Sequence, residues 1–353
     1  MGFGPFSNGN DHDTVVVSKS QDALARIFGE VAMTLASFKA SPTGGGEHAF
    51  IEWVKSRIAP SRRMVLGPGD DAAIIEWGVH QGDCVVTTDM LLDGSCFRLE
   101  ETNPVRIGRK SMAVNLSDIA AMAAKPVAAV ISVGLPRGGG RQLAERLFKG
   151  MEEIASLFSV PIVGGDTNSW KGPLVISITI LGEVTERGPA RRDGARPGDW
   201  LLTTGPLGGS ILGKHLDFMP RVPEALEIHK LAPIHAMMDI SDGLARDLHQ
   251  ICKASKCGAV VHGPSVPISH AAHNLSGESG KTPLEHALGD GEDFELLIAM
   301  PEYRAQALLE VQPIEGIQLH KIGQFVPEGV WIDQGDGKGP QPLGPLGYDH
   351  TLE

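Results

Sequence analysis

Two kinds of segment alternate along the chain. In one kind, apolar residues recur with the period of a helix; in the other, they form the short apolar runs typical of strands. Apolar positions three and four apart predict helices over residues 47–58, 102–126, 141–158 and 243–255. Asn103 is the predicted N-cap of the helix over residues 102–126. Short runs rich in β-branched residues predict strands over residues 84–91, 127–136, 160–163, 174–184, 200–205, 235–240, 258–263, 294–301 and 329–333. This alternation is typical of an α/β fold.

A turn-rich segment divides the pattern into two halves. Residues 191–200, RRDGARPGDW, combine charges with Gly and Pro and resemble a domain junction. We expect an N-terminal α/β domain over residues 46–184 and a C-terminal α/β domain over residues 185–353. Residues 1–45 are expected to form a flexible extension, because turn-forming polar residues and the run SPTGGG dominate its ends.

Composition narrows the class of protein. The chain has 353 residues, 42% of them hydrophobic and 21% charged, which is ordinary for a soluble globular enzyme. Its net charge of −12 argues against a nucleic-acid binder, and no apolar run is long enough to span a membrane. No secretory signal is evident, and none of the four cysteines forms a C-x-x-C pair. We expect a cytoplasmic protein with reduced thiols.

Three polar residues crowd the start of a predicted helix in the sequence MMDISDGLARDL. Asp239, Ser241 and Asp242 follow a strand, and one of them would suffice as a helix cap. Capping therefore leaves at least one carboxylate unexplained. Asp89 is expected to end the strand in VVTTD, and Asp166 follows a predicted strand in VPIVGGD. An acid in a turn is the alternative interpretation for both.

Three further acids lie in unusual surroundings. Asp118 has only uncharged neighbours three and four positions away on its helix, so its charge would be costly if buried. Asp70 and Asp71 lie in LGPGDDAAII, where a surface turn is the alternative. The same stretch resembles G-x-G-x-x-A, but two aspartates would repel the pyrophosphate of a dinucleotide.

Carboxylates at strand ends gather on one rim of an α/β sheet, where ligands bind. Two carboxylates about 4 Å apart repel by roughly 4 kcal/mol at an effective dielectric constant near 20. Several of them together require a counter-charge, and oxygen ligands favour Mg²⁺ over zinc or copper. The acids therefore predict a Mg²⁺ site of the kind that accompanies nucleotide phosphates.

No standard phosphate-binding motif accompanies these acids. Residues 208–215, GGSILGKH, nearly fit a P-loop, but His215 stands where the metal-binding hydroxyl belongs, and Lys214 falls inside a predicted helix. The alternative is a glycine-built turn between a strand and a helix. The motifs of protein kinases are also absent.

Seven motifs in a fixed order give a specific resemblance. They are GPGDDAAII, VVTTDMLLDG, AVNLSDIAAMAAKP, VGGDT, DISDGLARDL, GDGEDFELL and GYDH. Together they resemble the thiamine-monophosphate kinase family of the PurM-like (aminoimidazole-ribonucleotide-synthetase-like) superfamily, over roughly residues 46–350. The resemblance implies two PurM-like α/β domains, a homodimer joined through the N-terminal domains, and a cleft for ATP, several Mg²⁺ ions and thiamine monophosphate as the acceptor. Direct transfer of the γ-phosphate, with no phosphoenzyme, is our hypothesis.

The resemblance also implies roles for individual residues. The implied metal ligands are Asp71, Thr88, Asp89, Asp118, Asp166, Asp239 and Asp242, of which Asp71, Asp118, Asp166 and Asp242 are the expected catalytic acids. The implied ATP contacts are Gly165, Asp166, Arg192 and Ser241, and the implied substrate contacts are Cys96, Glu292 and Tyr348.

Two positions depart from the family pattern. Cys96 stands where the family usually has a substrate-contacting His, and Phe294 replaces a usual Tyr. A relative acting on another acceptor, or a non-catalytic nucleotide-binding protein, is the alternative. The absence of a Cys before Cys84 argues against a selenophosphate synthetase, and the end YDHTLE argues against a hydrogenase-maturation protein.

Overall fold

The computed structural model describes residues 64–67, 70–77, 82–138 and 140–349. Contacts divide the chain into residues 1–45 and 46–353, and everything described belongs to the second unit. The expected extension and the helix predicted over residues 47–58 lie outside the described residues. None of the described helices combines the length and the apolar character needed to cross a membrane.

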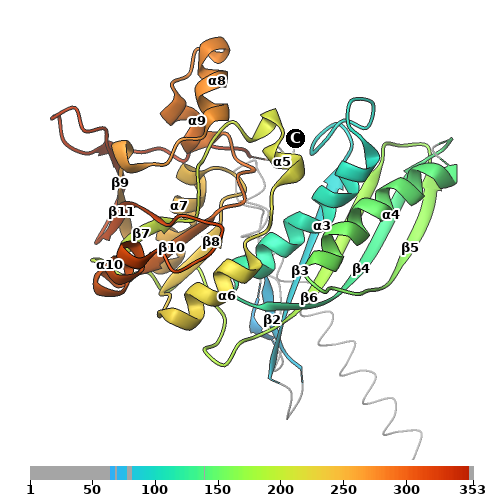
Figure 1. Cartoon of the computed structure of the whole chain (residues 1–353), viewed down its shortest axis with the longest axis horizontal. Coiled ribbons are helices and arrows are strands. Elements are labelled where there is room, and N and C mark those ends of the chain that lie inside the picture. Colours follow the sequence, from blue (N-terminus) through green and yellow to red (C-terminus); the bar gives the residue numbers. More distant parts are fainter. Residues whose placement is uncertain (1–63, 68–69, 78–81, 139, 350–353) are drawn as a thin grey trace, which may run out of the picture. The chain divides into compact units, whose positions relative to one another are not determined.

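The first half is built on one mixed sheet. Its described strands are β1 (Met64–Leu66), β2 (Ala73–Glu76), β3 (Asp83–Leu92), β4 (Lys125–Pro136), β5 (Ile162–Trp170) and β6 (Val175–Glu183). They lie in the order β1-β2-β3-β6-β4-β5; only β4 and β5 are parallel. Two helices, α3 (Pro104–Ala121) and α4 (Gly140–Leu157), pack on one face of this sheet (Figure 1).

Local sequence signals explain how α3 begins and how it packs. Asn103 is its N-cap and accepts a hydrogen bond from the Val105 N–H at 3.0 Å, as the sequence predicted. Most of the 18 residues of α3 are buried. Glycines let the two helices approach closely, because a Cβ on Gly108 would lie 1.9 Å from the Leu147 carbonyl oxygen, and one on Gly150 would lie 1.8 Å from that of Val105.

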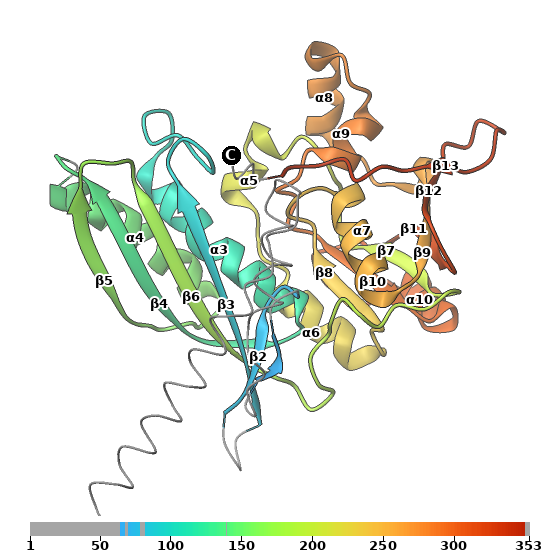
Figure 2. The same cartoon turned by 180° about the vertical axis from the view of Figure 1, so that it is seen from behind.

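The other face of the first sheet has no helix over it among the described residues, as the view from behind shows (Figure 2). Apolar side chains are exposed on its strands. Met90 is 59% exposed and Val130 41%. Such exposed apolar side chains on a sheet are typical of an interaction surface.

The second half contains a seven-stranded sheet. Its strands are β7 (Trp200–Thr203), β8 (Ala236–Asp239), β9 (Gly258–His262), β10 (Leu296–Met300), β11 (His320–Val326), β12 (Val330–Asp333) and β13 (Gln341–Pro342), in the order β13-β12-β9-β11-β7-β10-β8. The helices of this half are α5 (Lys214–Asp217), α6 (Val222–Leu231), α7 (Leu244–Ser255), α8 (His270–Ser279), α9 (Pro283–Gly289) and α10 (Glu302–Val311), with short 3₁₀ turns η1 (Ser210–Leu212) and η2 (Gly263–Ser265).

The strand β10, between β7 and β8, is buried on both faces. Leu296, Ile298 and Met300 belong to the apolar cluster that also contains the core of the first half, whereas Leu297 and Ala299 belong to a cluster on the other face of the second sheet. One apolar core therefore runs from the first half into the second. The helix α3 contributes to this join, because it contacts α5, α6 and β8.

Two expectations about local structure were wrong. The strand predicted over residues 160–163 does not end there, because β5 continues through Gly164 and Gly165 and pairs with β4. Asp89 also lies within β3 rather than at its end. The glycines serve close packing, since a Cβ on Gly165 would lie 2.0 Å from the carbonyl oxygen of Ile131.

Candidate active site

A cavity of about 640 Å³ collects most of the residues that the sequence singled out. Its walls come from both halves of the described chain. The predicted site residues that line it are Asp71, Thr88, Asp89, Cys96, Asp118, Arg192, Asp239, Ser241, Asp242, Glu292 and Tyr348. Gly165 and Asp166 do not line it.

Three acids form the tightest group in this cavity. Asp71 precedes β2, Asp118 lies on α3 and Asp239 ends β8, so three separate elements bring them together. Each offers a carboxylate oxygen, and these oxygens lie within 4.8 Å of one another. Asp89 on β3 lines the same cavity. The predicted convergence of the acids is therefore present, although not along one rim of strand ends.

Neighbouring groups hold these carboxylates in place. The Thr87 hydroxyl donates to Asp118, and the Ser117 hydroxyl donates to Asp239 Oδ2 at 2.5 Å. Arg192 Nη2 lies 2.6 Å from Asp71 Oδ1, and its Nε lies 3.3 Å from Asp70 Oδ1. The other oxygen of Asp71, Oδ2, is buried without a hydrogen-bond partner.

Burial and mutual repulsion raise the pKa values of the acids. Burial raises the pKa of Asp89 to about 7, with a further contribution from the charge of Asp239. Burial also raises the pKa of Asp239 to about 6. The pKa values of Asp71 and Asp118 are raised well above their usual range, first by burial and then by the other carboxylates of the cluster. Ionising the whole cluster therefore requires added positive charge.

The arrangement fits a hard divalent cation. All donors in the group are carboxylate oxygens, and Asp71 Oδ2 lacks the hydrogen bond that a buried oxygen needs. Mg²⁺ binds through a few carboxylates and keeps its remaining positions for water and substrate phosphates. Asp71, Asp118 and Asp239 are the residues placed to hold such an ion.

The capping interpretation of the opening motif was wrong. Gly243 is the N-cap residue of α7 and provides no side-chain hydrogen bond. The Asp247 carboxylate instead accepts from the N–H groups of Asp242 and Gly243, each at 3.1 Å. Ser241 and Asp242 are thus not cap residues, and both line the cavity.

Other residues that line the cavity differ in character from the acid cluster. They are Cys96, Lys110, Glu292, Phe294 and Tyr348, and Glu292 is the one acid among these five. The ring of Phe294 stacks on that of Phe218 with centroids 3.9 Å apart. The Tyr348 N–H donates to the Asp242 carbonyl at 3.0 Å, which ties the end of the described chain to the acid-rich part.

Asp166 and Gly165 lie apart from this cavity within one chain. They belong to the edge strand β5, which two strands separate from β3, so strand spacings of about 4.8 Å place it about 14 Å away. They line a second, more apolar cavity of about 680 Å³ between α4 and the sheet. Phe148, 45% exposed, lies in the wall of this second cavity.

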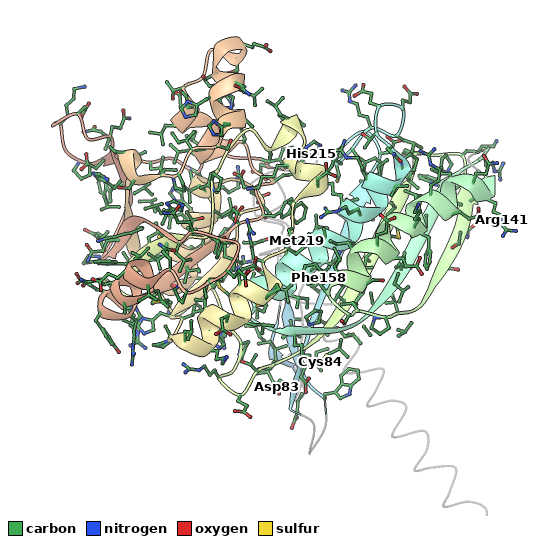
Figure 3. All side chains as sticks on the ribbon, viewed as in Figure 1. Asp83, Cys84, Arg141, Phe158, His215 and Met219 are labelled. Atoms are coloured by element: carbon green, nitrogen blue, oxygen red, sulfur yellow. The ribbon has the colours of Figure 1, made fainter. Side chains whose placement is uncertain are left out.

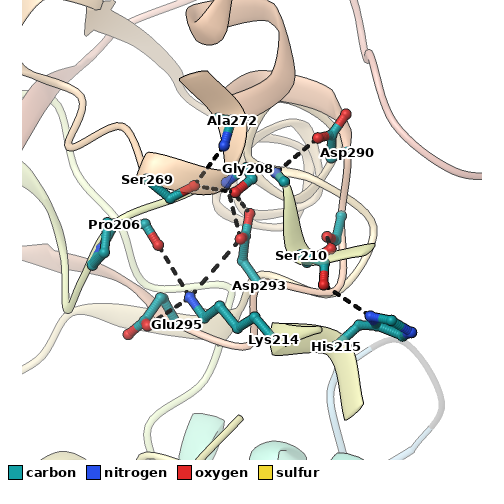
Figure 4. Close-up of polar contacts among 12 residues, drawn as sticks. Pro206, Gly208, Ser210, Lys214, His215, Ser269, Ala272, Asp290, Asp293 and Glu295 are labelled. Carbon is teal, nitrogen blue, oxygen red and sulfur yellow. Dashed lines mark hydrogen bonds and ion pairs between the residues drawn. The ribbon is translucent and has the colours of Figure 1, made fainter. Parts of the chain in front are cut away.

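The loop that resembles a P-loop is filled by protein groups (Figure 4). The Gly208 N–H donates to both oxygens of Asp293, at 2.9 and 3.0 Å, and the Gly209 N–H donates to Asp290 Oδ2 at 2.8 Å. Lys214 Nζ lies 2.9 Å from Glu295 Oε1. A phosphate would have to displace buried carboxylates, so this loop is a structural turn, in agreement with the alternative stated from the sequence.

Comparison with known proteins places the chain in a family. The family "AIR synthase related protein, N-terminal domain" matches residues 69–184, and its C-terminal domain matches residues 196–332. Thiamine-monophosphate kinase of Rhodopirellula baltica is 42% identical over 292 residues, which cover 81% of this chain and 91% of that protein. The chain belongs to the thiamine-monophosphate kinase family.

Other members of the thiamine-monophosphate kinase family are also similar to this chain over most of their length. The Escherichia coli (strain K12) enzyme is 33% identical over 330 residues, covering 86% of this chain and 98% of its own. A solved structure described as AaThiL complexed with AMPPCP and TMP has a TM-score of 0.75 at 28% identity, and covers 89% of this chain and 100% of that one. The expected two-domain PurM-like α/β fold is thereby confirmed.

Sequence reasoning missed Lys110. It lies on α3 four residues before Val114 and eight before Asp118, and all three line the cavity. This spacing places them on one face of a helix. The signal was present in the sequence, but it becomes visible only when the helical face of Asp118 is followed for two turns.

Proposed function

We propose that this chain is a thiamine-monophosphate kinase, which transfers the γ-phosphate of ATP to the phosphate of thiamine monophosphate and gives thiamine diphosphate and ADP. Membership of the family supports this reaction, and so does the relative described as complexed with AMPPCP and TMP. The observation that carries the proposal is the convergence of Asp71, Asp118 and Asp239 from distant segments into one cavity.

The acids supply metal binding rather than proton transfer. The acceptor is a phosphate monoester that is already anionic near neutral pH, so it needs no strong general base. Mg²⁺, when bound, neutralises the phosphates and aligns them for in-line displacement. We propose that Asp71, Asp118 and Asp239 hold one ion. Thr88, Asp89 and Asp242 line the same cavity and are proposed as ligands of further ions.

We propose that the two ends of the cavity receive different parts of the reactants. Arg192 and Ser241 lie at the acid-rich end, where ATP phosphates would lie close to the metal ligands. Cys96, Glu292 and Tyr348 line the same cavity, and we place the acceptor against these three residues. This division follows from charge: the metal site attracts polyphosphate, and the less acidic, partly aromatic end accepts an organic group.

Asp166 and Gly165 fit this scheme through a second copy of the chain. We propose a homodimer joined through the uncovered face of the first sheet, where Met90 and Val130 are exposed. A dimer can bring β5 of one copy to the cavity of the other, which β5 does not reach within its own chain. The apolar wall around Phe148 in the neighbouring cavity then suits the adenine ring.

The test is an acceptor screen with the purified full chain. Incubation with ATP, Mg²⁺ and thiamine monophosphate is expected to give equimolar ADP and thiamine diphosphate, and omission of Mg²⁺ should abolish both. ADP formed only with another phosphorylated acceptor would favour a relative with a different substrate. Binding of nucleotide without turnover would favour a non-catalytic protein.

The cellular location is proposed on chemical grounds. All four cysteines are free thiols, at positions 84, 96, 252 and 257. Free thiols and a substrate supply of ATP suit a reducing, nucleotide-rich compartment. We propose that the protein works in the cytoplasm, which fractionation followed by immunoblotting would test.

A further inference from the structure

Lys110 is a buried cation between two residues of the proposed acceptor site. Its side chain is 1% exposed, and its ammonium group lies 2.8 Å from the Cys96 carbonyl oxygen and 2.5 Å from Glu292 Oε1. An unpaired buried ammonium is costly, so these contacts fix the position of the group. One ammonium therefore connects α3, the loop that carries Cys96, and the segment that carries Glu292.

Glu292 is held in an unusual backbone conformation. The φ of Glu292 is +52°, and that of the preceding Gly291 is +74°. A non-glycine residue in this left-handed region of backbone conformation is strained. The Glu292 N–H donates to the Ser241 carbonyl at 2.7 Å, which anchors the segment to the acid-rich end. The carboxylate pairs with Lys110 through Oε1 and remains 36% exposed at the cavity wall. Strain and partial exposure together indicate a side chain that is presented to a ligand.

A second lysine, Lys214, forms a comparable ion pair that lies outside the site cavity. Lys214 is 28% exposed and pairs with Glu295, which is 1% exposed and also bonds Arg221 and Thr204. Neither Lys214 nor Glu295 lines the site cavity. The pair Lys110–Glu292 differs because its carboxylate faces the cavity, which is what a role in substrate positioning requires.

We infer that Lys110 is a positioning residue for the acceptor: it holds the Glu292 carboxylate and the main chain of Cys96 in the geometry that binds the organic part of thiamine monophosphate. This inference rests on the proposed function. Lys110 lies two helical turns from Asp118, about 12 Å along α3. The loss of Lys110 should therefore disturb the acceptor end and leave the metal and ATP end intact.

Steady-state kinetics of Lys110→Met test this role. The variant should raise KM for thiamine monophosphate by about 10- to 100-fold, the loss expected for a hydrogen bond to a charged group, and change KM for ATP by less than about twofold. Glu292→Gln should give the same split. The double variant should be no worse than the poorer single variant, because both changes remove one interaction. Lys110→Arg, which keeps the charge, should lie closer to the wild type.

Lys214→Met is the matched control. It should lower the melting temperature but leave both KM values near those of the wild type. If Lys110→Met does not fold, Lys110→Arg and Glu292→Gln carry the same comparison. An equal rise in both KM values, additive effects in the double variant, or a normal KM for the acceptor would overturn the inference. A wild type that never phosphorylates thiamine monophosphate would instead refute the proposed function.

Discussion

Replacing Asp118 by Asn removes one charge from the acid cluster and nearly preserves the shape of the side chain. The oxygens of Asp71, Asp118 and Asp239 lie within 4.8 Å, a distance at which two unit charges repel by about 3.5 kcal/mol at an effective dielectric constant near 20. Because the raised pKa values show that bound protons relieve part of this repulsion, we expect a smaller gain. Asp118→Asn should stabilise the metal-free protein by about 1–3 kcal/mol at about pH 8.

The gain should depend on pH. A carboxylate whose folded pKa is raised contributes stability that is fully present below its unfolded pKa, and this stability is lost as the pH rises through the folded pKa. Burial raises the pKa of Asp239 to about 6 and that of Asp89 to about 7, so the metal-free wild type should lose stability between about pH 4 and pH 7. The advantage of Asp118→Asn should be smallest near pH 4 and grow across this window.

Thermal unfolding with a chelator and with Mg²⁺ measures both effects. Without metal, Asp118→Asn should melt a few degrees above the wild type; with Mg²⁺, it should lose most of the stabilisation that the wild type gains, together with turnover. Asp83→Asn, at the start of β3 and outside the cavity, is the control and should change neither. A metal-free Asp118→Asn protein that is less stable than the wild type at about pH 8 would refute the reasoning.

Three further changes test other parts of the structure. Asp166→Asn should abolish ADP formation without changing the melting temperature, because the side chain is exposed; near-normal turnover would contradict its metal role. Gly150→Ala should destabilise the protein by about 3 kcal/mol in urea unfolding, because its Cβ meets backbone, whereas Gly277→Ala in α8, with open space around it, should not destabilise it. Iodoacetamide should alkylate the partly exposed Cys96, and thiamine monophosphate, but not ATP alone, should slow this reaction in peptide mapping.

Much of the local structure follows directly from sequence. The helix predicted over residues 102–126 forms from Pro104 to Ala121, and Asn103 caps it as expected. Its end came earlier than expected, because Ala123 takes a positive φ and Lys125 already belongs to β4. Patterns of apolar residues specify such elements well, because the residues that form the buried face of a helix lie close together in the sequence.

The arrangement of the site was harder to predict. Asp71, Asp118 and Asp239 converge as the resemblance implied, but Asp89 lies in the middle of a long strand, and Asp166 lies on a sheet edge. Strand length and order depend on pairing between distant segments, which the local pattern does not contain. The proposed role of Asp166 depends on a second copy of the chain. Contacts between two copies are even harder to predict from the local pattern than strand pairing within one copy.

The pairing of Lys110 with Glu292 illustrates the same limit. The two residues are 182 positions apart in sequence, and only the packing of α3 against the second half brings them together. The positive φ of Glu292 and Phe294 also gives no sequence signal, since neither is a glycine. The same packing brings α5, which carries the labelled His215, against α3 (Figure 3).

The apolar core shared by the two halves has a consequence for how such a protein can change over time. Residues of α3, α6 and β10 pack in one apolar cluster. Cutting the chain near residue 185 would therefore expose a large apolar surface on each fragment. Neither fragment is expected to stay folded and soluble alone. Replacing one half by that of a distant relative would also require matching changes in the apolar core that the two halves share. We therefore expect the two halves to unfold together, in a single transition.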